Sequence, residues 1–277
     1  MTGRVEQFTV GERFRIEATT TSGEITVRTG SAEEVVVRVD GPAAEDYRIT
    51  QHGDTISVLP ERSSMLRRFS STDVFLDVPP GGSLSLISAS GDLLVQAEVA
   101  ELDATTASGD IKVATVTGPG RIRSASGDIS VDAVDGHLAV DTAAGDVRVG
   151  RVGSDLLVTS ASGDIAVDYC AECVDARTAS GDLTIRKVGG ADVAVKTMSG
   201  DIRLGIPPRR TLDVDLQTLS GDVRNRLPQG DGSPPEKRIA IKVKTLSGDV
   251  TLQGVPLSPP TPPAPPAPFS GVHQPNG

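Results

Sequence analysis

The chain has very few aromatic residues. Phe, Tyr and Trp make up 3% of its 277 residues and tryptophan is absent, whereas valine, isoleucine and leucine carry most of the hydrophobicity. A thick core, such as that of a compact sandwich or an α/β enzyme, usually relies on bulky aromatic side chains to fill its centre. A thin core of repeated β-branched residues does not need them. The composition therefore favours a solenoid.

Disulfides, basic charge and long apolar runs are also lacking. Two cysteines cannot form a disulfide framework. The net charge of −10 argues against a nucleic-acid partner or an anionic membrane surface, because phosphate binding needs clustered lysine and arginine. The first residues contain no apolar leader, and no run reaches the length of a membrane span. We therefore expect a cytoplasmic protein without membrane insertion, and association with the cell envelope stays open.

A Ser-Gly-Asp motif recurs through most of the chain. Ser22-Gly23-Glu24 is a diverged copy near the start. The nine closer copies, one of them Ala-Gly-Asp at Gly145, have their glycine at Gly91, Gly109, Gly127, Gly145, Gly163, Gly181, Gly200, Gly221 and Gly248. The first six follow one another at intervals of 18 residues, and the later intervals are 19, 21 and 27. A fixed period of this kind is the signature of a repeat architecture.

Aliphatic residues alternate on both sides of each motif. Counted from the glycine, positions −7, −5, +2 and +4 are mostly Leu, Ile or Val, as in Leu138, Val140, Val147 and Val149. Alternation by two is the period of a β-strand with one buried face. Each repeat therefore provides two short strands separated by a corner. The sequence predicts an all-β fold, a parallel β-solenoid of about nine 18-residue coils with two strands per coil.

Two further positions of the repeat line the corners. The residue three before each glycine is always serine or threonine, as in Thr106 and Ser124. It shares the parity of the inward residues, so we expect a stacked row of hydroxyls, each bonded to a neighbouring backbone or hydroxyl group, because unpaired buried polar groups are costly. Position +7 is valine in most coils and Cys170 in one. We expect it to fill the second corner.

The two ends of the chain differ from the repeat. Residues 1–80 contain alternating segments, two of which flank a His52-Gly53-Asp54 turn, and we predict an N-terminal β-cap that covers the first coil. Residues 81–255 form the predicted solenoid, with insertions at 206–210 and 228–235. Residues 256–277 are rich in proline, which is typical of a polyproline-type, disordered tail.

The aspartate of the motif is the main candidate for chemistry. Stacked carboxylates repel one another unless they are paired, and one interpretation is a calcium ladder like that of nonapeptide β-rolls. Those rolls carry Gly-Asp turns on both edges, whereas this chain has one per coil. The interpretation that we favour is a turn in which each aspartate accepts hydrogen bonds from backbone N–H groups and serine hydroxyls. The calcium candidates are Asp110, Asp128, Asp146, Asp164 and Asp182.

No catalytic constellation is visible. Cys170 and Cys173 form a lone Cys-x-x-Cys without a second ligand pair, so Cys170 is expected to be a core residue. His52, His137 and His273 fall in two turns and the tail. A carbohydrate-active β-helix enzyme, the remaining alternative, would need a groove of acids and aromatics that short turns do not build. We predict no enzyme and no cofactor, but a structural or protein-interaction scaffold.

The repeats also carry a family resemblance. From Asp77-Val-Pro-Pro-Gly81 through the Ser-Gly-Asp-(Ile/Leu/Val)-x-Val repeats, the sequence resembles the bacterial β-strand-repeat family known as "putative adhesin" or as a domain of unknown function. The resemblance covers roughly residues 10–255. It implies a β-solenoid fold and an adhesin-like role at the cell envelope, and it supplies no catalytic residues. A partner protein would bind a face of the solenoid or the proline-rich tail.

Overall fold

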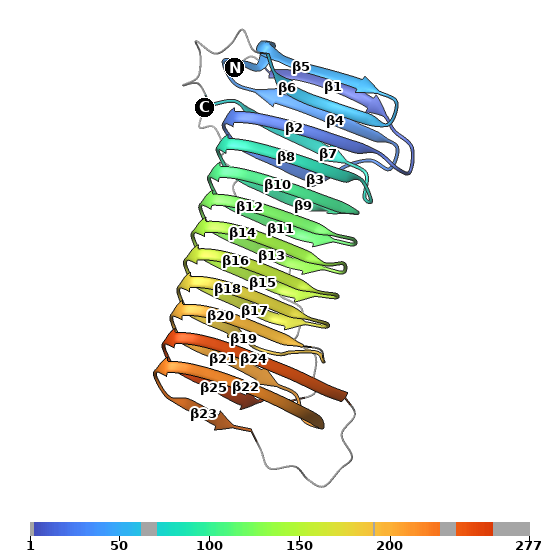
Figure 1. The fold of residues 1–277 in the computed structure, drawn as a ribbon. Helices are drawn as coiled ribbons and strands as arrows, with labels where there is room; N and C mark the ends of the chain where they lie inside the picture. The colour runs from blue at the N-terminus through green and yellow to red at the C-terminus, as the bar shows by residue number, and fades with distance from the viewer. Residues whose placement is uncertain (1–2, 62–70, 191, 228–236, 257–277) are drawn as a thin grey trace, which may run out of the picture.

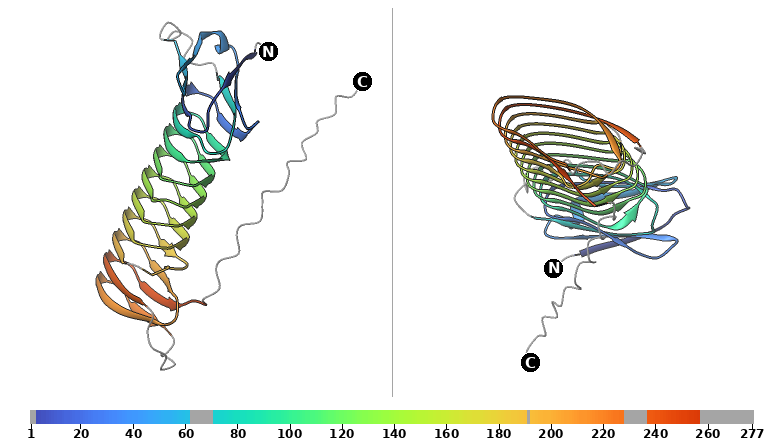
Figure 2. Two further views of the ribbon diagram at one scale, coloured as in Figure 1. Left: turned by 90° about the vertical axis from the view of Figure 1, so that its right-hand side faces the viewer. Right: turned by 90° about the horizontal axis from the view of Figure 1, so that it is seen from below.

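Two facing β-sheets make up the molecule. The computed structural model describes residues 3–61, 71–190, 192–227 and 237–256. Their strands form a sheet of 13 strands, called sheet A, and a sheet of 12 strands, called sheet B. Each coil gives one strand to each sheet, and the coils stack into a rod (Figures 1 and 2). The predicted two-sheet parallel solenoid is confirmed, whereas residues 257–277 of the predicted tail lie outside the described residues.

The regular coils occupy the middle of the rod. Their sheet-B strands, which precede the corner, are β8 (Ser83–Ser90), β10 (Glu101–Ser108), β12 (Gly120–Ser126), β14 (Leu138–Ala144), β16 (Leu156–Ser162), β18 (Val174–Ser180) and β20 (Val193–Ser199). Their sheet-A strands, which follow the corner, are β9 (Leu93–Val99), β11 (Ile111–Val116), β13 (Ile129–Val134), β15 (Val147–Val152), β17 (Ile165–Cys170), β19 (Leu183–Ile185) and β21 (Ile202–Ile206). Neighbouring coils pair in parallel, so equivalent positions of the repeat lie side by side.

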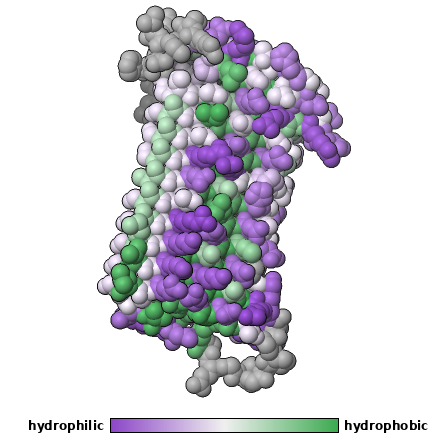
Figure 3. Space-filling view, in the orientation of Figure 1, coloured by the Kyte–Doolittle hydropathy of each residue, from purple (hydrophilic) through white to green (hydrophobic). Residues whose placement is uncertain are grey.

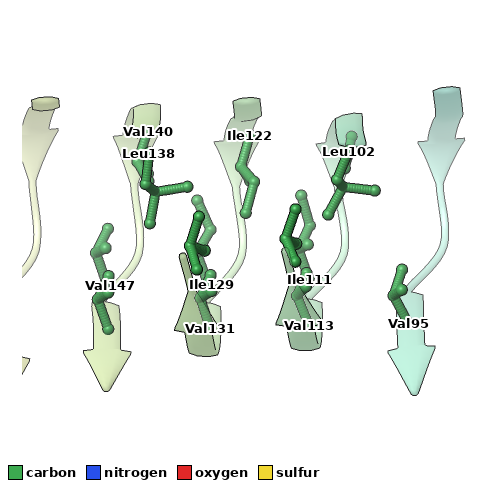
Figure 4. Packing of buried hydrophobic residues seen from close by; sticks show 14 of the residues in the cluster. Val95, Leu102, Ile111, Val113, Ile122, Ile129, Val131, Leu138, Val140 and Val147 are labelled. Atoms are coloured by element: carbon green, nitrogen blue, oxygen red, sulfur yellow. The ribbon is translucent and has the colours of Figure 1, made fainter. Parts of the chain in front are cut away.

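The core is a thin layer between the two sheets. Leu138 and Val140 point inward from sheet B, and Val147 and Val149 point inward from sheet A. All four side chains are at most 2% exposed. Figure 4 shows this packing for several coils. Repeated aliphatic residues are large enough to fill a layer of this thickness, so the core does not need aromatic side chains. Among the described buried apolar residues, the only aromatic ones are Phe14 and Tyr47, both near the N-terminus.

The N-terminal region contributes both coils and a cap. One coil, β2 (Arg15–Ser22) and β3 (Ile25–Thr29), turns at the diverged motif and lies in the stack next to β8 and β9. A second, β6 (Thr55–Pro60) and β7 (Asp73–Val78), lies outside it. The antiparallel strands β1 (Gly3–Thr9), β4 (Glu34–Asp40) and β5 (Tyr47–His52), with the short helix η1 (Ala44–Asp46), close this end of the rod.

At the C-terminal end the chain order and the spatial order differ. The coil formed by β24 (Lys237–Ser247) and β25 (Val250–Gly254) lies between β20–β21 and the coil formed by β22 (Arg210–Ser220) and β23 (Val223–Arg226). The chain thus skips one place in the stack and fills it afterwards. One core position explains why the coil β22–β23 is the outermost. At +4, where every other coil has Val, Ile or Leu, β23 has the polar Asn225, which suits a coil with a neighbour on one side only.

Candidate functional site

Each Ser-Gly-Asp corner depends on the backbone freedom of its glycine. Gly127 has a φ of +116°, in the region that side-chain-bearing residues rarely adopt. A Cβ atom on Gly127 would also overlap the backbone carbonyl oxygen of Gly109 in the preceding coil. The corners of adjacent coils are therefore packed backbone to backbone. This explains why the motif keeps glycine in every copy.

The aspartates of the motif form a ladder along the rod. In each link the Oδ1 atom of one aspartate accepts a hydrogen bond from the backbone N–H of the aspartate in the next coil. The distance from the backbone nitrogen to Oδ1 is 3.0 Å from Asp128 to Asp110, 2.9 Å from Asp146 to Asp128 and 2.8 Å from Asp182 to Asp164. The structure brings all five calcium candidates into this single ladder. Each carboxylate thus satisfies the backbone of the neighbouring coil and ties adjacent coils together.

Arginines neutralise part of the aspartate row. Arg148 lies 2.9 Å from Asp146 and 3.9 Å from Asp128, measured to Oδ2. Arg224 lies 2.7 Å from Oδ2 of Asp249. The hydrogen bond from the backbone N–H of Asp222, together with Arg224, lowers the pKa of Asp249 below its ordinary value. Within the described ranges, no three His, Cys, Asp or Glu side chains form a group that could hold a metal ion.

One titration tests the alternative that the ladder binds calcium. We expect about 1 mM calcium to leave the melting midpoint unchanged, because a calcium site needs 6–8 oxygen ligands and Oδ1 of each aspartate already accepts a backbone N–H. A ligand that binds only the folded state must raise the midpoint. The measurement is thermal unfolding after chelator treatment, with and without calcium, and magnesium serves as the control. A rise specific to calcium would restore the calcium ladder.

The hydroxyl row behind the corner is present and buried. Thr106, Thr142 and Thr178 are at most 8% exposed. Each donates a hydrogen bond to the backbone carbonyl two residues further on, at 3.2, 3.1 and 3.0 Å respectively. The stacked hydroxyl row is confirmed, but the expected bond of every hydroxyl to a neighbour is wrong, because these acceptors are carbonyls of the same coil. Thr106 also lies 3.5 Å from the carbonyl of Gly91 in the preceding coil, whereas the hydroxyl of Ser88 has no partner among the described residues. A local bond of this kind satisfies the buried hydroxyl and fixes the approach of the strand to the corner.

The cysteines and histidines do not form a site in the described part of the chain. Cys170 is buried, and its Sγ atom donates to the carbonyl of Ser154 at 3.3 Å, so the expectation of a core residue is confirmed. Burial raises the pKa of Cys170 to about 11. Cys173 is exposed. His52 ends β5 and His137 precedes β14, both at the surface, whereas His273 lies outside the described residues.

The two cysteines are expected to differ in reactivity. At pH 8 iodoacetamide should modify Cys173 and leave Cys170 unmodified, because the thiolate is the reactive form and the pKa of Cys170 is about 11. Mass spectrometry of the alkylated protein, with a Cys173→Ser variant, measures this directly. Unfolding in urea should make Cys170 react. Modification of both residues at equal rates in the folded protein would contradict the buried position of Cys170.

The outer face of sheet B carries a row that periodicity alone does not reveal. Two residues before the glycine the side chain points outward. In the first six regular coils, β8–β9 to β18–β19, this residue is always alanine, namely Ala89, Ala107, Ala125, Ala143, Ala161 and Ala179. We call these residues the alanine row. A shallow, largely apolar groove of about 700 Å³ runs beside it over β2 to β16, lined also by Thr105 and Ile87. The recurrence of alanine at an exposed position is the sequence signal that could have found it.

Comparison with known proteins places the fold in a family. The sequence profile of the Toastrack DUF4097 family matches residues 14–253. This chain belongs to the toastrack family. The match spans the coil β2–β3 and every Ser-Gly-Asp corner, so the family resemblance read from the repeats is confirmed. No curated protein matches this toastrack chain.

Several solved structures resemble this toastrack protein at low identity. A Bacteroides fragilis "putative adhesin" is 14% identical with a TM-score of 0.41, and the alignment covers 92% of this chain and 97% of the other. A Clostridium sporogenes "putative cell adhesion protein" is 9% identical with a TM-score of 0.24, covering 92% and 100%. A Parabacteroides distasonis "putative lipid binding protein" is 10% identical with a TM-score of 0.27, covering 92% and 95%. These names describe those proteins alone.

Over residues 3–61, 71–190, 192–227 and 237–256, no helix has the length and the apolar character needed to cross a bilayer.

Proposed function

We propose that this protein is a non-catalytic, adhesin-like scaffold that binds an extended segment of a partner protein along the alanine row. The observation that carries the proposal is the groove beside that row, which is apolar, shallow and continuous over several coils. Because Ala107 and Ala125 project a single methyl group each, a partner backbone can approach the sheet face closely. Contiguous exposed apolar surface is typical of interaction sites.

The rigidity of the rod supports this role. The corners are locked by backbone packing at Gly127 and its equivalents and by the aspartate ladder. A surface that is already ordered does not lose conformational entropy when it binds, which leaves more of the contact energy for affinity. Coils stacked about 4.8 Å apart present the same side chains repeatedly, and a partner that spans several coils gains from each contact.

Site-specific cross-linking tests the proposal. A photo-reactive amino acid at Ala125 should capture a partner protein in cells of the native host, whereas the same group at Lys112, exposed on sheet A, should not. An Ala125→Arg variant, which fills the groove with a long charged side chain, should lose that partner while it folds like the parent. Capture of the same protein from both positions, or capture that Ala125→Arg leaves intact, would overturn the assignment of the binding face.

A further inference from the structure

At the C-terminal end of the rod, large apolar residues continue the alanine row. Because β24 lies between β20 and β22, the row passes from Ala179 to Met198, Leu246 and Leu219 in neighbouring strands. These three side chains are 59%, 50% and 81% exposed. Figure 3 shows a pale apolar row along the left margin of the rod that becomes strongly apolar over the C-terminal coils. A contiguous exposed row of large apolar side chains marks an interaction surface.

Three lysines lie beside these apolar residues. Lys196 and Lys244 are directly opposite each other in β20 and β24. Lys242 points to the same outer face two residues away, opposite Asp215 of β22. No ion pair of these three lysines forms among the described residues. One coil earlier in the same row, Arg177 is paired with Asp175 at 2.6 Å. Like charges directly opposite on adjacent strands destabilise a sheet, and a bound anion would relieve that cost.

The C-terminal end is basic although the whole chain is acidic. Residues 209–226 and 237–254, the last two coils of the stack, contain eight lysines and arginines against four aspartates, a net charge of +4 in a chain of −10. Two aspartates at this corner, Asp222 and Asp249, are paired with Arg224. β23 ends at Arg226, β24 begins at Lys237 and β25 ends at Gly254, all at the opposite corner of the coil. The net acidity of the chain therefore does not describe this surface.

We propose that Met198, Leu246, Leu219, Lys196, Lys242 and Lys244 form a basic-apolar patch that docks the rod on a bilayer of anionic lipids. The three apolar side chains enter the boundary between headgroups and acyl chains, and the lysines bind the anionic headgroups. A soluble polyanion would account for the lysines but leaves three exposed apolar side chains without a role. Binding through so few groups is reversible and weakens with salt.

Vesicle sedimentation with the full chain tests the patch. The protein should bind vesicles of phosphatidylcholine with phosphatidylglycerol and not vesicles of phosphatidylcholine alone. A Lys196→Gln, Lys242→Gln, Lys244→Gln variant should bind the anionic vesicles about 100-fold more weakly, given the contribution of each lysine near an anionic surface. A Lys112→Gln variant, which removes an exposed lysine of sheet A, is the control and should bind like the parent.

The apolar half of the patch has its own matched variant. Changing Met198, Leu246 and Leu219 to alanine extends the alanine row of the regular coils, so the fold should be retained, as circular dichroism can verify. This variant should bind anionic vesicles at least about tenfold more weakly, because buried apolar area is lost. Three results would overturn the proposal: no binding to anionic vesicles, equal binding to both vesicle types, or full binding by the alanine variant, which would indicate a soluble polyanion instead.

Discussion

A Gly127→Val variant is expected to lose about 3–5 kcal/mol of unfolding free energy, a loss found only where a mutation has a specific structural cause. Two causes act together here. The φ of +116° at Gly127 is strained for a β-branched residue, and its Cβ atom would overlap the carbonyl oxygen of Gly109. Both are backbone features in the middle of the stack, where the neighbouring coils hold the corner on both sides.

Two other glycines separate these causes. Gly53 has a φ of +59°, and no atom lies within 4 Å of the place that a Cβ atom would take, so Gly53→Val carries the backbone strain alone and should cost about 1–2 kcal/mol. Gly11 has neither feature, and Gly11→Val should stay within about 0.5 kcal/mol of the parent. Urea unfolding of the three variants gives the comparison. If Gly127→Val unfolds at the same urea concentration as the parent, the corner assignment is wrong.

The repeat made most of the fold predictable, because each regular coil experiences nearly the same surroundings. Inward residues such as Val140 and Val147 follow a period of two, and stacking places equivalent residues side by side. The partner of each aspartate was harder to predict. A bond within its own turn and a bond to the adjacent coil use the same residues at the same spacing. Only the structure shows that Oδ1 of Asp110 bonds the N–H of Asp128.

The order of the last coils could not be read from the repeat. Every coil has nearly the same backbone edges for pairing with a neighbour. By the repeat alone, β22 and β24 could therefore pair with β20 equally well. The information that decides the order lies in single departures from the repeat. Asn225 stands in β23 at the +4 position, where the other coils have Val, Ile or Leu. In the resulting order the inward residue Val214 of β22 is 40% exposed, whereas Ile241 of β24 is fully buried. The opposed lysines of the basic-apolar patch could not be found from the sequence for the same reason, since Lys196 and Lys244 are neighbours only in the spatial order.

Deleting one whole coil is expected to leave a folded protein. Removing residues 128–145 joins Gly127 to Asp146, so Asp146 takes the place of Asp128 and its N–H faces Oδ1 of Asp110. In a stack stabilised by contacts between neighbours, the loss is one coil's share of the total, on the order of 1 kcal/mol. The melting midpoint should therefore fall by about 2–4 °C. Circular dichroism measures both the strand content and the midpoint.

Deleting half a coil is the matched control, and it should abolish folding. Removal of residues 137–145 takes away β14 and its corner, so β13 runs directly into β15 although both belong to sheet A. The following coils can then join the stack only if sheet B has a gap or if inward residues such as Val147 turn outward, and either change exposes core surface over several coils. The shorter deletion should thus be far more damaging than the longer one. A nine-residue deletion that melted like the parent, or an 18-residue deletion that failed to fold, would show that the coils are not interchangeable units of one stack.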